Sequence, residues 1–282
     1  MHRARSLPKL VVPMWVGLVV ASTLGAAGCG RSVHLGQLGD GGGGPPDTGN
    51  GSPDATDGGS NVLWQATFEP GDLSEWMADG NGGAYVVGAG VAPAVTTAFA
   101  HRGSYAGIAA VMPTASVVAD SYWFRTQPSP DAAYYSAWYF ISGSIQVQSW
   151  LSLIHLRVST SGDGHNLVPV WDFNANQRPD GSLVPHLYNF LMKVNFEQQT
   201  LAAWPRATWF HLEMYLRKSP TNGQITIWQD DVQVLNVTGV PTASTDWIEW
   251  AVGNASDGIS PSPAIVYVDD AAISLTRLGD QP

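Results

Sequence analysis

Residues 209–217 alternate between the two sides of an extended chain along their whole length. The run Trp-Phe-His-Leu-Glu-Met-Tyr-Leu-Arg places a large apolar side chain at every second position, beginning at Phe210. Successive side chains of a β-strand point to opposite faces, so this spacing predicts a strand with one face in a hydrophobic core. The core face would carry Phe210, Leu212, Met214 and Leu216.

A second alternating run, Gln224 to Trp228, follows after Asn222-Gly223, a dipeptide typical of hairpin turns. The two runs predict a β-hairpin in which Arg217 pairs with Gln224, Tyr215 with Thr226 and Glu213 with Trp228. The outward face of this hairpin would then form one patch, which consists of Trp209, His211, Glu213, Tyr215, Arg217, Gln224, Thr226 and Trp228.

Strand signals also dominate the rest of the chain after about residue 62. Further strands are expected at residues 134–141, 150–158, 184–193, 247–252 and 265–273. The only helical signal is a possible turn near residues 197–202. We therefore expect residues 62–278 to form one all-β domain, a size typical of a single β-sandwich.

Composition excludes several classes of protein. The chain has 13 Lys and Arg against 23 Asp and Glu, so nucleic acid is not an expected partner. A single cysteine, Cys29, means that no disulfide can stabilise the domain. The 12 tryptophans suit both a sandwich core and stacking on the apolar faces of sugars, and the sequence leaves both open.

The first 28 residues have the pattern of a secretory signal, with basic residues before an apolar run that ends in small residues at Cys29. This resembles the lipobox of bacterial lipoproteins, which implies lipidation of Cys29. Gly30 follows the cysteine, which favours the outer membrane or the cell surface. Residues 29–61 are rich in Gly, Asp and Pro and are expected to form a flexible tether, so the membrane would be contacted by the lipid anchor only.

Three motifs follow one another in the order expected of a single fold, with one at each end of the domain and the hairpin between them. They are Phe68-Glu69-Pro70-Gly71-Asp72-Leu73-Ser74-Glu75-Trp76, the Trp209-to-Trp228 hairpin, and Val266-Tyr267-Val268-Asp269-Asp270-Ala271-Ala272-Ile273. Together they resemble concanavalin A-like jelly rolls, and within them bacterial polysaccharide lyases and carbohydrate-binding modules. The resemblance covers nearly all of residues 62–276 and implies a sandwich of two antiparallel sheets with a face that binds extended polysaccharides.

The same resemblance implies a structural Ca²⁺ where the first and last strands lie side by side. Calcium takes oxygen ligands, and Glu69, Asp72 and Asp269 match by position. Asp269 is preferred over Asp270 because only one of two successive residues on a strand can point inward. Solvated acids at the strand ends are the alternative.

Two kinds of glycan chemistry can be compared on the residues. Laminarinase-like glycoside hydrolysis needs paired carboxylates in a Glu-x-Asp-x-Glu or similar run, and the chain has none. Lyase chemistry needs a base, a proton donor and a group that neutralises a carboxylate. Ile154-His155 resembles part of the Gln-Ile-His motif of alginate lyases, with Leu153 in place of the Gln. The candidate catalytic residues are His155, Arg157, His211 and Tyr215.

The prediction from sequence is a surface-anchored, monomeric lipoprotein whose jelly roll binds an extracellular or cell-wall polysaccharide, without catalysis. The substrate-binding residues would be Trp209, Glu213, Arg217, Gln224, Trp228, His186 and Tyr188. A polysaccharide lyase that cleaves a uronate-containing glycan is the alternative, and a structural or adhesive protein is the third possibility.

Overall fold

The computed structural model describes residues 61–112, 118–243 and 247–279. Residues 1–60 lie outside this part of the chain. They include the predicted signal segment 1–28, Cys29, and all of the predicted tether 29–61 except Asn61. Among the residues described, no helix has the length and hydrophobicity needed to cross a lipid bilayer.

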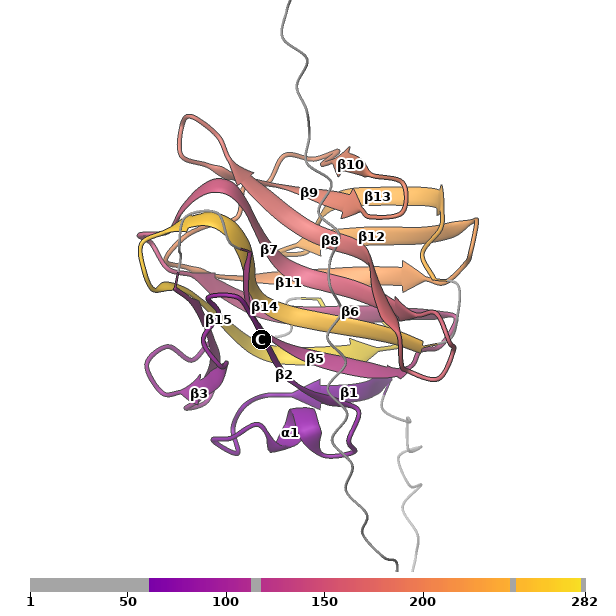
Figure 1. Cartoon of the computed structure of the whole chain (residues 1–282), viewed down its shortest axis with the longest axis horizontal. Coiled ribbons are helices and arrows are strands. Elements are labelled where there is room, and N and C mark those ends of the chain that lie inside the picture. The colour runs from indigo at the N-terminus through magenta and orange to yellow at the C-terminus, as the bar shows by residue number, and fades with distance from the viewer. Residues whose placement is uncertain (1–60, 113–117, 244–246, 280–282) are drawn as a thin grey trace, which may run out of the picture. The chain divides into compact units, whose positions relative to one another are not determined.

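Two antiparallel sheets make up nearly all of the regular secondary structure of the described chain, which confirms the expected all-β jelly roll. The eight strands of sheet A are β1 (Val62–Ala66), β3 (Ala94–Thr96), β4 (Ala106–Val111), β6 (Ala132–Ile141), β11 (Trp209–Arg217), β12 (Gly223–Gln229), β13 (Val232–Val240) and β15 (Ala264–Ser274). The seven strands of sheet B are β2 (Gly82–Val87), β5 (Ala119–Pro128), β7 (Gln146–Ser159), β8 (Leu167–Gln177), β9 (Leu183–Asn189), β10 (Val194–Glu197) and β14 (Trp247–Ser260). Figure 1 shows β8, β7 and β14 of sheet B in front of β11, β12 and β6 of sheet A.

The strand order explains how the two ends of the domain meet. Sheet A runs β13-β12-β11-β6-β15-β4-β3, and β1 pairs with β15. The first and last strands therefore lie side by side, as the family resemblance implies. Sheet B runs β10-β9-β8-β7-β14-β5-β2, which places the long strands β7 and β14 at its centre.

The predicted hairpin has the expected register. Glu213 pairs with Trp228, Tyr215 with Thr226 and Arg217 with Gln224. The four residues predicted to face the core are at most 1% exposed. The alternation of side chains was therefore sufficient to predict both the strands and their pairing.

The other predicted strands all overlap observed ones, with two differences in detail. β9 ends at Asn189 because residues 190–193 form a turn, in which the Asn189 Oδ1 accepts a hydrogen bond from the Met192 N–H at 2.7 Å. The helical turn expected near 197–202 is wrong: Glu197 ends β10 and no helix follows. The one helix of the described residues is the short α1 (Ser74–Met77), which buries Trp76.

Tryptophans fill the space between the sheets. Trp76, Trp123, Trp171, Trp204 and Trp250 are all at most 2% exposed. Trp76 stacks on Trp123 with 6.2 Å between ring centroids, and Trp64 meets Trp76 edge-on at 4.7 Å. These tryptophans are therefore core residues, and they are not available to stack on a ligand at the surface.

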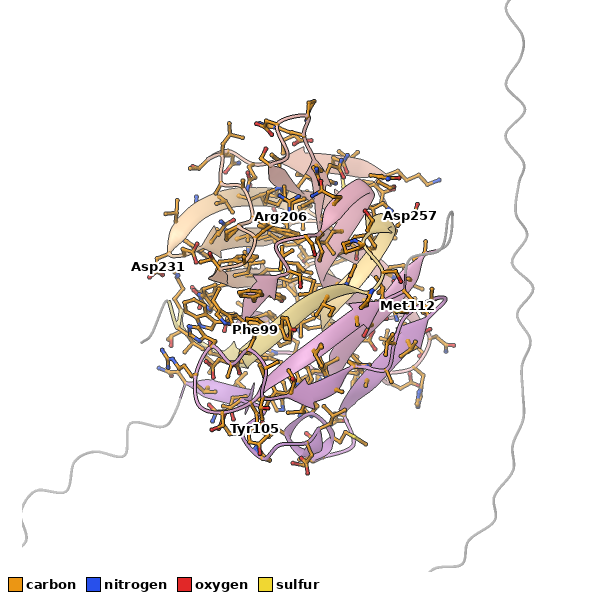
Figure 2. The ribbon with its side chains drawn as sticks, turned by 90° about the vertical axis from the view of Figure 1, so that its left-hand side faces the viewer. Phe99, Tyr105, Met112, Arg206, Asp231 and Asp257 are labelled. Atoms are coloured by element: carbon orange, nitrogen blue, oxygen red, sulfur yellow. The ribbon has the colours of Figure 1, made fainter. Side chains whose placement is uncertain are left out.

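The connection between β3 and β4 packs on sheet A through aromatic side chains. Figure 2 shows Phe99 and Tyr105 in this connection. Phe99 stacks on Phe140 of β6 at 5.1 Å and contacts Tyr267 of β15 at the same centroid distance. Aromatic packing thus holds the residues that join β3 to β4 against the outer face of the sheet.

Core burial on β13 yields a direct test of the fold. Leu235 is completely buried, whereas Val232 on the same strand is 51% exposed. We expect Leu235→Ala to lower the free energy of unfolding by about 2–5 kcal/mol through lost burial and a cavity. Val232→Ala should change it by less than about 0.5 kcal/mol, as surface substitutions usually do. Urea denaturation followed by tryptophan fluorescence measures both, and equal effects would contradict the observed orientation of β13.

Candidate functional site

The outer face of sheet B carries a depression lined by polar and aromatic side chains. Two adjoining cavities of about 590 and 550 Å³ lie on it, and Arg157 of β7 lines both. The first also contains side chains from β5, β7, β8 and β9, and the second contains side chains from β2, β5, β14 and residues 163–167. We call the pair the sheet B groove.

His155 and Asp172 form the central polar pair of the groove. They are cross-strand neighbours on β7 and β8, and the His155 Nδ1 lies 2.7 Å from the Asp172 Oδ1. Burial lowers the pKa of His155, but the charge and hydrogen bond of Asp172 and the charge of Asp120 outweigh this, so the pKa is raised above its ordinary value. The Nε2 atom has no partner within the described structure. Asp172 therefore holds the ring by one nitrogen and leaves the other for chemistry.

Tyr122 of β5 lies beside His155, with 5.4 Å between ring centroids. The neighbouring residue of β14 is Gly253, where a Cβ would come within 2.7 Å of the Tyr122 Cβ. Glycine at this position is needed for the close approach of the tyrosine. Burial raises the pKa of Tyr122, so its hydroxyl stays protonated, and no hydrogen-bond partner for it is present in the described part of the chain.

Arg157 covers Tyr122 and contributes the positive charge of the groove. Its guanidinium carbon lies 5.7 Å from the Tyr122 ring and 5.6 Å from the Tyr85 ring. Its Nη1 donates to the Glu249 Oε1 at 3.3 Å, and Thr126 donates to the other oxygen of Glu249 at 3.1 Å. Burial raises the pKa of Glu249, although Arg157 acts in the opposite direction.

Further polar groups face the first cavity without partners. Asp120 Oδ1 and Asn174 Oδ1 are buried and make no hydrogen bond in the residues described. His186 and Tyr188 of β9, both predicted as binding residues, line the same cavity. Burial lowers the pKa of His186, so this ring is neutral at neutral pH. Oriented but unpaired acceptors of this kind suit the hydroxyl groups of a bound ligand.

The structure separates the candidate residues of the sequence into two groups. His155, Arg157, His186 and Tyr188 lie on sheet B, whereas His211, Tyr215 and the rest of the hairpin patch lie on sheet A. The hairpin buries its apolar face in the core between the sheets, so its polar face points away from the groove. The expected set of His155, Arg157, His211 and Tyr215 is therefore not brought together.

Several polar groups of the hairpin patch already have partners inside the protein. Glu213 is completely buried and accepts from the Arg277 Nε at 2.8 Å and from the Leu278 N–H at 2.6 Å. Arg277 also lies 4.7 Å from the Trp228 ring. Gln224 donates to Thr226 and Asn236, and burial lowers the pKa of His211 to about 4. Trp209 and Arg217 remain partly exposed on this face.

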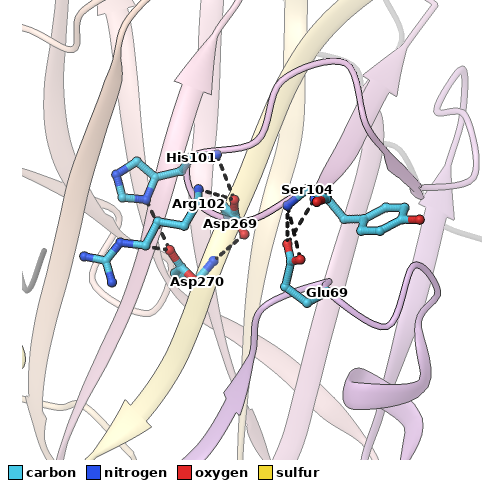
Figure 3. A network of polar contacts seen from close by, with 7 residues as sticks. Glu69, His101, Arg102, Ser104, Asp269 and Asp270 are labelled. Atoms are coloured by element: carbon cyan, nitrogen blue, oxygen red, sulfur yellow. Dashed lines mark hydrogen bonds and ion pairs between the residues drawn. The ribbon is translucent and has the colours of Figure 1, made fainter.

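Two of the three predicted calcium ligands reach the same loop, as Figure 3 shows. The Glu69 carboxylate accepts from the backbone N–H groups of Ser104 and Tyr105, and the Asp269 carboxylate accepts from those of His101 and Arg102. Asp72 does not join them: it is exposed and accepts from the Ser74 N–H at 2.9 Å. The described residues contain no group of three His, Cys, Asp or Glu side chains that could hold a metal ion.

Asp269 is nevertheless an unusual carboxylate. It is completely buried, while Asp270 beside it is partly exposed, as expected for the pair. Burial and the neighbouring charge of Asp270 raise the pKa of Asp269 to about 7. The carboxylates of Glu69 and Asp269 thus both bind the backbone of residues 101–105. A Ca²⁺ ion coordinated by their oxygens stays a prediction.

Comparison with solved structures supports the jelly-roll fold. An endo-β-1,4-glucuronan lyase from the fungus Trichoderma reesei is 14% identical over 76% of this chain and 96% of its own, with a TM-score of 0.53. The cellulose induced protein Cip1 is 18% identical over 76% of this chain and 98% of its own, with a TM-score of 0.51. No family model matches the sequence, and no curated protein does. At these identities the likeness shows the fold alone.

The calcium prediction can be tested through stability. If the ion binds at Glu69 and Asp269, added Ca²⁺ will raise the midpoint of thermal unfolding, because a ligand that binds only the folded state stabilises it. Asp269→Asn should abolish this response, while Asp72→Asn should preserve it. A midpoint that is the same in Ca²⁺ and in a chelator would contradict the prediction.

The His155–Asp172 pair predicts a specific dependence on pH. In Asp172→Asn, burial should dominate and the pKa of His155 should fall below its ordinary value of about 6.5. Because the native pKa is raised, the pair stabilises the fold fully below the unfolded pKa and loses this contribution as pH rises through the folded pKa. The variant should thus be more destabilised under acidic than under alkaline conditions. NMR titration measures the pKa of His155, with the pKa of His186 as the internal control. A His155 pKa that is the same in the variant and the native protein would contradict the inferred role of Asp172.

Proposed function

We propose that the sheet B groove binds a uronate-containing polysaccharide and cleaves it by β-elimination. The observation that supports this most strongly is the cluster of His155 and Arg157 of β7 with Tyr122, which reaches them from β5 across β14 and contacts both. A base, a proton donor and a cation are the three groups that this reaction needs. The fold shared with a glucuronan lyase is consistent with the proposal.

The roles follow from the contacts of each side chain, with His155 acting as the base in its neutral form. His155 Nε2 takes the proton from the carbon next to the uronate carboxyl group, with Asp172 on Nδ1 stabilising the imidazolium that forms. The electron pair forms a C=C bond as the glycosidic C–O bond breaks. The Tyr122 hydroxyl, which its raised pKa keeps protonated, gives its proton to the leaving oxygen. A proton returned from His155 to Tyr122 through water restores both groups.

Arg157 would neutralise the substrate carboxylate and at the same time open the site. In the free protein its guanidinium lies over Tyr122, which is only 1% exposed. The ion pair with Glu249, at 3.3 Å, is a long one, and a substrate carboxylate competes with it directly. Movement of Arg157 onto the substrate would then uncover the Tyr122 ring, which lies beside His155.

Binding without cleavage is the second candidate, and one observation favours it. Asp120, Asp172 and Glu249 place three carboxyl groups close to the reacting position, which suits the hydroxyl groups of a neutral sugar better than an acidic one. Retention of a neutral polysaccharide with no cleavage of any uronate polymer would support this function over elimination.

Matched variants on the two sheets test the proposal. β-Elimination produces an unsaturated uronate that absorbs ultraviolet light, so activity can be followed by absorbance. His155→Ala and Tyr122→Phe should each reduce the rate by about 10²–10⁴-fold, the usual contribution of a general acid or base. Tyr215→Phe makes the same chemical change on sheet A and should leave the rate unchanged. Loss of activity in Tyr215→Phe with retention in Tyr122→Phe would place the reaction on the other sheet.

A further inference from the structure

The distribution of charge along the sheet B groove is uneven. Arg157, at the junction of the two cavities, is the one Lys or Arg among the residues that line them. Its charge is balanced by Glu249, and a protonated His155 is balanced by Asp172. We call the first cavity, away from Arg157, the first arm of the groove, and the second cavity the second arm. Neither arm therefore provides a permanent positive charge that is not balanced by a carboxylate.

The first arm combines rings with acceptors. Trp150 and Tyr188 line it as partly exposed rings, together with the unpartnered oxygens of Asp120 and Asn174. Aromatic faces stack on the apolar faces of sugar rings, and carboxylate or amide oxygens accept from hydroxyl groups. A second carboxylate on the ligand would meet Asp120 at this position.

The second arm, on the other side of Arg157, has the same character. Trp247 is held by the loop that precedes β8, because a Cβ at Gly164 would come within 2.9 Å of the Trp247 ring. Tyr85 is 42% exposed and lines the same cavity, as do Asp163 and Glu249. This arm is therefore also lined by aromatic rings and carboxylates.

Building on the proposed function, we propose that the substrate is a heteropolysaccharide in which one uronate, bound at Arg157, is flanked on both sides by uncharged sugars. A homopolymer of uronates would place carboxylates in both arms against Asp120 and Asp163. Like charges that meet across an interface oppose binding and are a common source of specificity. The groove thus selects for a single charge between neutral neighbours.

A panel of polymers tests this with two readouts. Hyaluronan and gellan contain uronates separated by neutral sugars, whereas alginate and polyglucuronate are made of uronates alone. We expect the first pair to be retained in affinity electrophoresis and cleaved, by ultraviolet absorbance, at least about tenfold better than the second pair at low salt. Added salt should narrow the difference, since screening weakens repulsion between exposed charges.

A variant pair identifies the cause of the preference. Asp163→Asn should improve retention and cleavage of the homopolymers severalfold. Asp180→Asn is the matched control: Asp180 is also an exposed turn residue whose carboxylate accepts from the backbone two residues ahead, and it lines neither cavity. Asp180→Asn should change nothing.

The outcomes separate the inference from the proposed function. Preferential retention of hyaluronan or gellan without an absorbance change would support the substrate class and refute elimination. Equal or better cleavage of alginate or polyglucuronate would overturn the inference and leave elimination standing, and equal or better retention of them without cleavage would overturn both. Failure to retain or cleave any of the four polymers would overturn both.

Discussion

The arrangement of the groove depends on the burial of large aromatic side chains between the two sheets. With no disulfide available to the described domain, hydrophobic burial supplies the main cohesive force, and Trp123 and Trp250 occupy the adjacent strands β5 and β14 of sheet B. On a strand, each inward residue forces its neighbours outward. Burial of Trp123 therefore presents Tyr122 on the outer face, and burial of Leu156 presents His155 and Arg157. The core thus determines which residues meet in the groove.

Balanced charge is the second condition for the groove. His155 and Asp172 are both less than a tenth exposed, and an unpaired charge at this depth would carry a large cost of desolvation. Pairing offsets most of that cost, so His155 and Asp172 can both be charged although little solvent surrounds them. The same pairing leaves Arg157 as the one site that can attract an anion, because its contact with Glu249 is the longest of the charged contacts in the groove.

The sequence predicted some elements well because their pattern was simple. Residues 209–228 alternate cleanly and have a turn signal between them, so their register was predicted correctly. β5 and β8 were missed, since β5 is buried on both faces and β8 begins with Leu-Val-Pro-Val, which has no alternation. These strands carry Tyr122, Asp172 and Asn174, which were therefore missing from the predicted site. The alternation of polar and apolar residues in Asp172-Phe173-Asn174 was the one signal that could have predicted β8 and its polar face. No pattern along the chain could show that the hairpin and His155 belong to different sheets, because pairing between distant strands is a property of the fold.

The separation of the two polar faces has a functional consequence. On sheet A, Glu213 is neutralised by Arg277, and the residues that follow β15 cover part of the hairpin, so its polar groups serve mainly to hold the chain. On sheet B, the corresponding groups are left with unused acceptors and donors in cavities large enough for sugar rings. Unsatisfied buried groups lower stability and are retained where a ligand completes them. The polar face of sheet A is therefore largely satisfied within the protein, whereas the outer face of sheet B keeps polar groups available to a ligand.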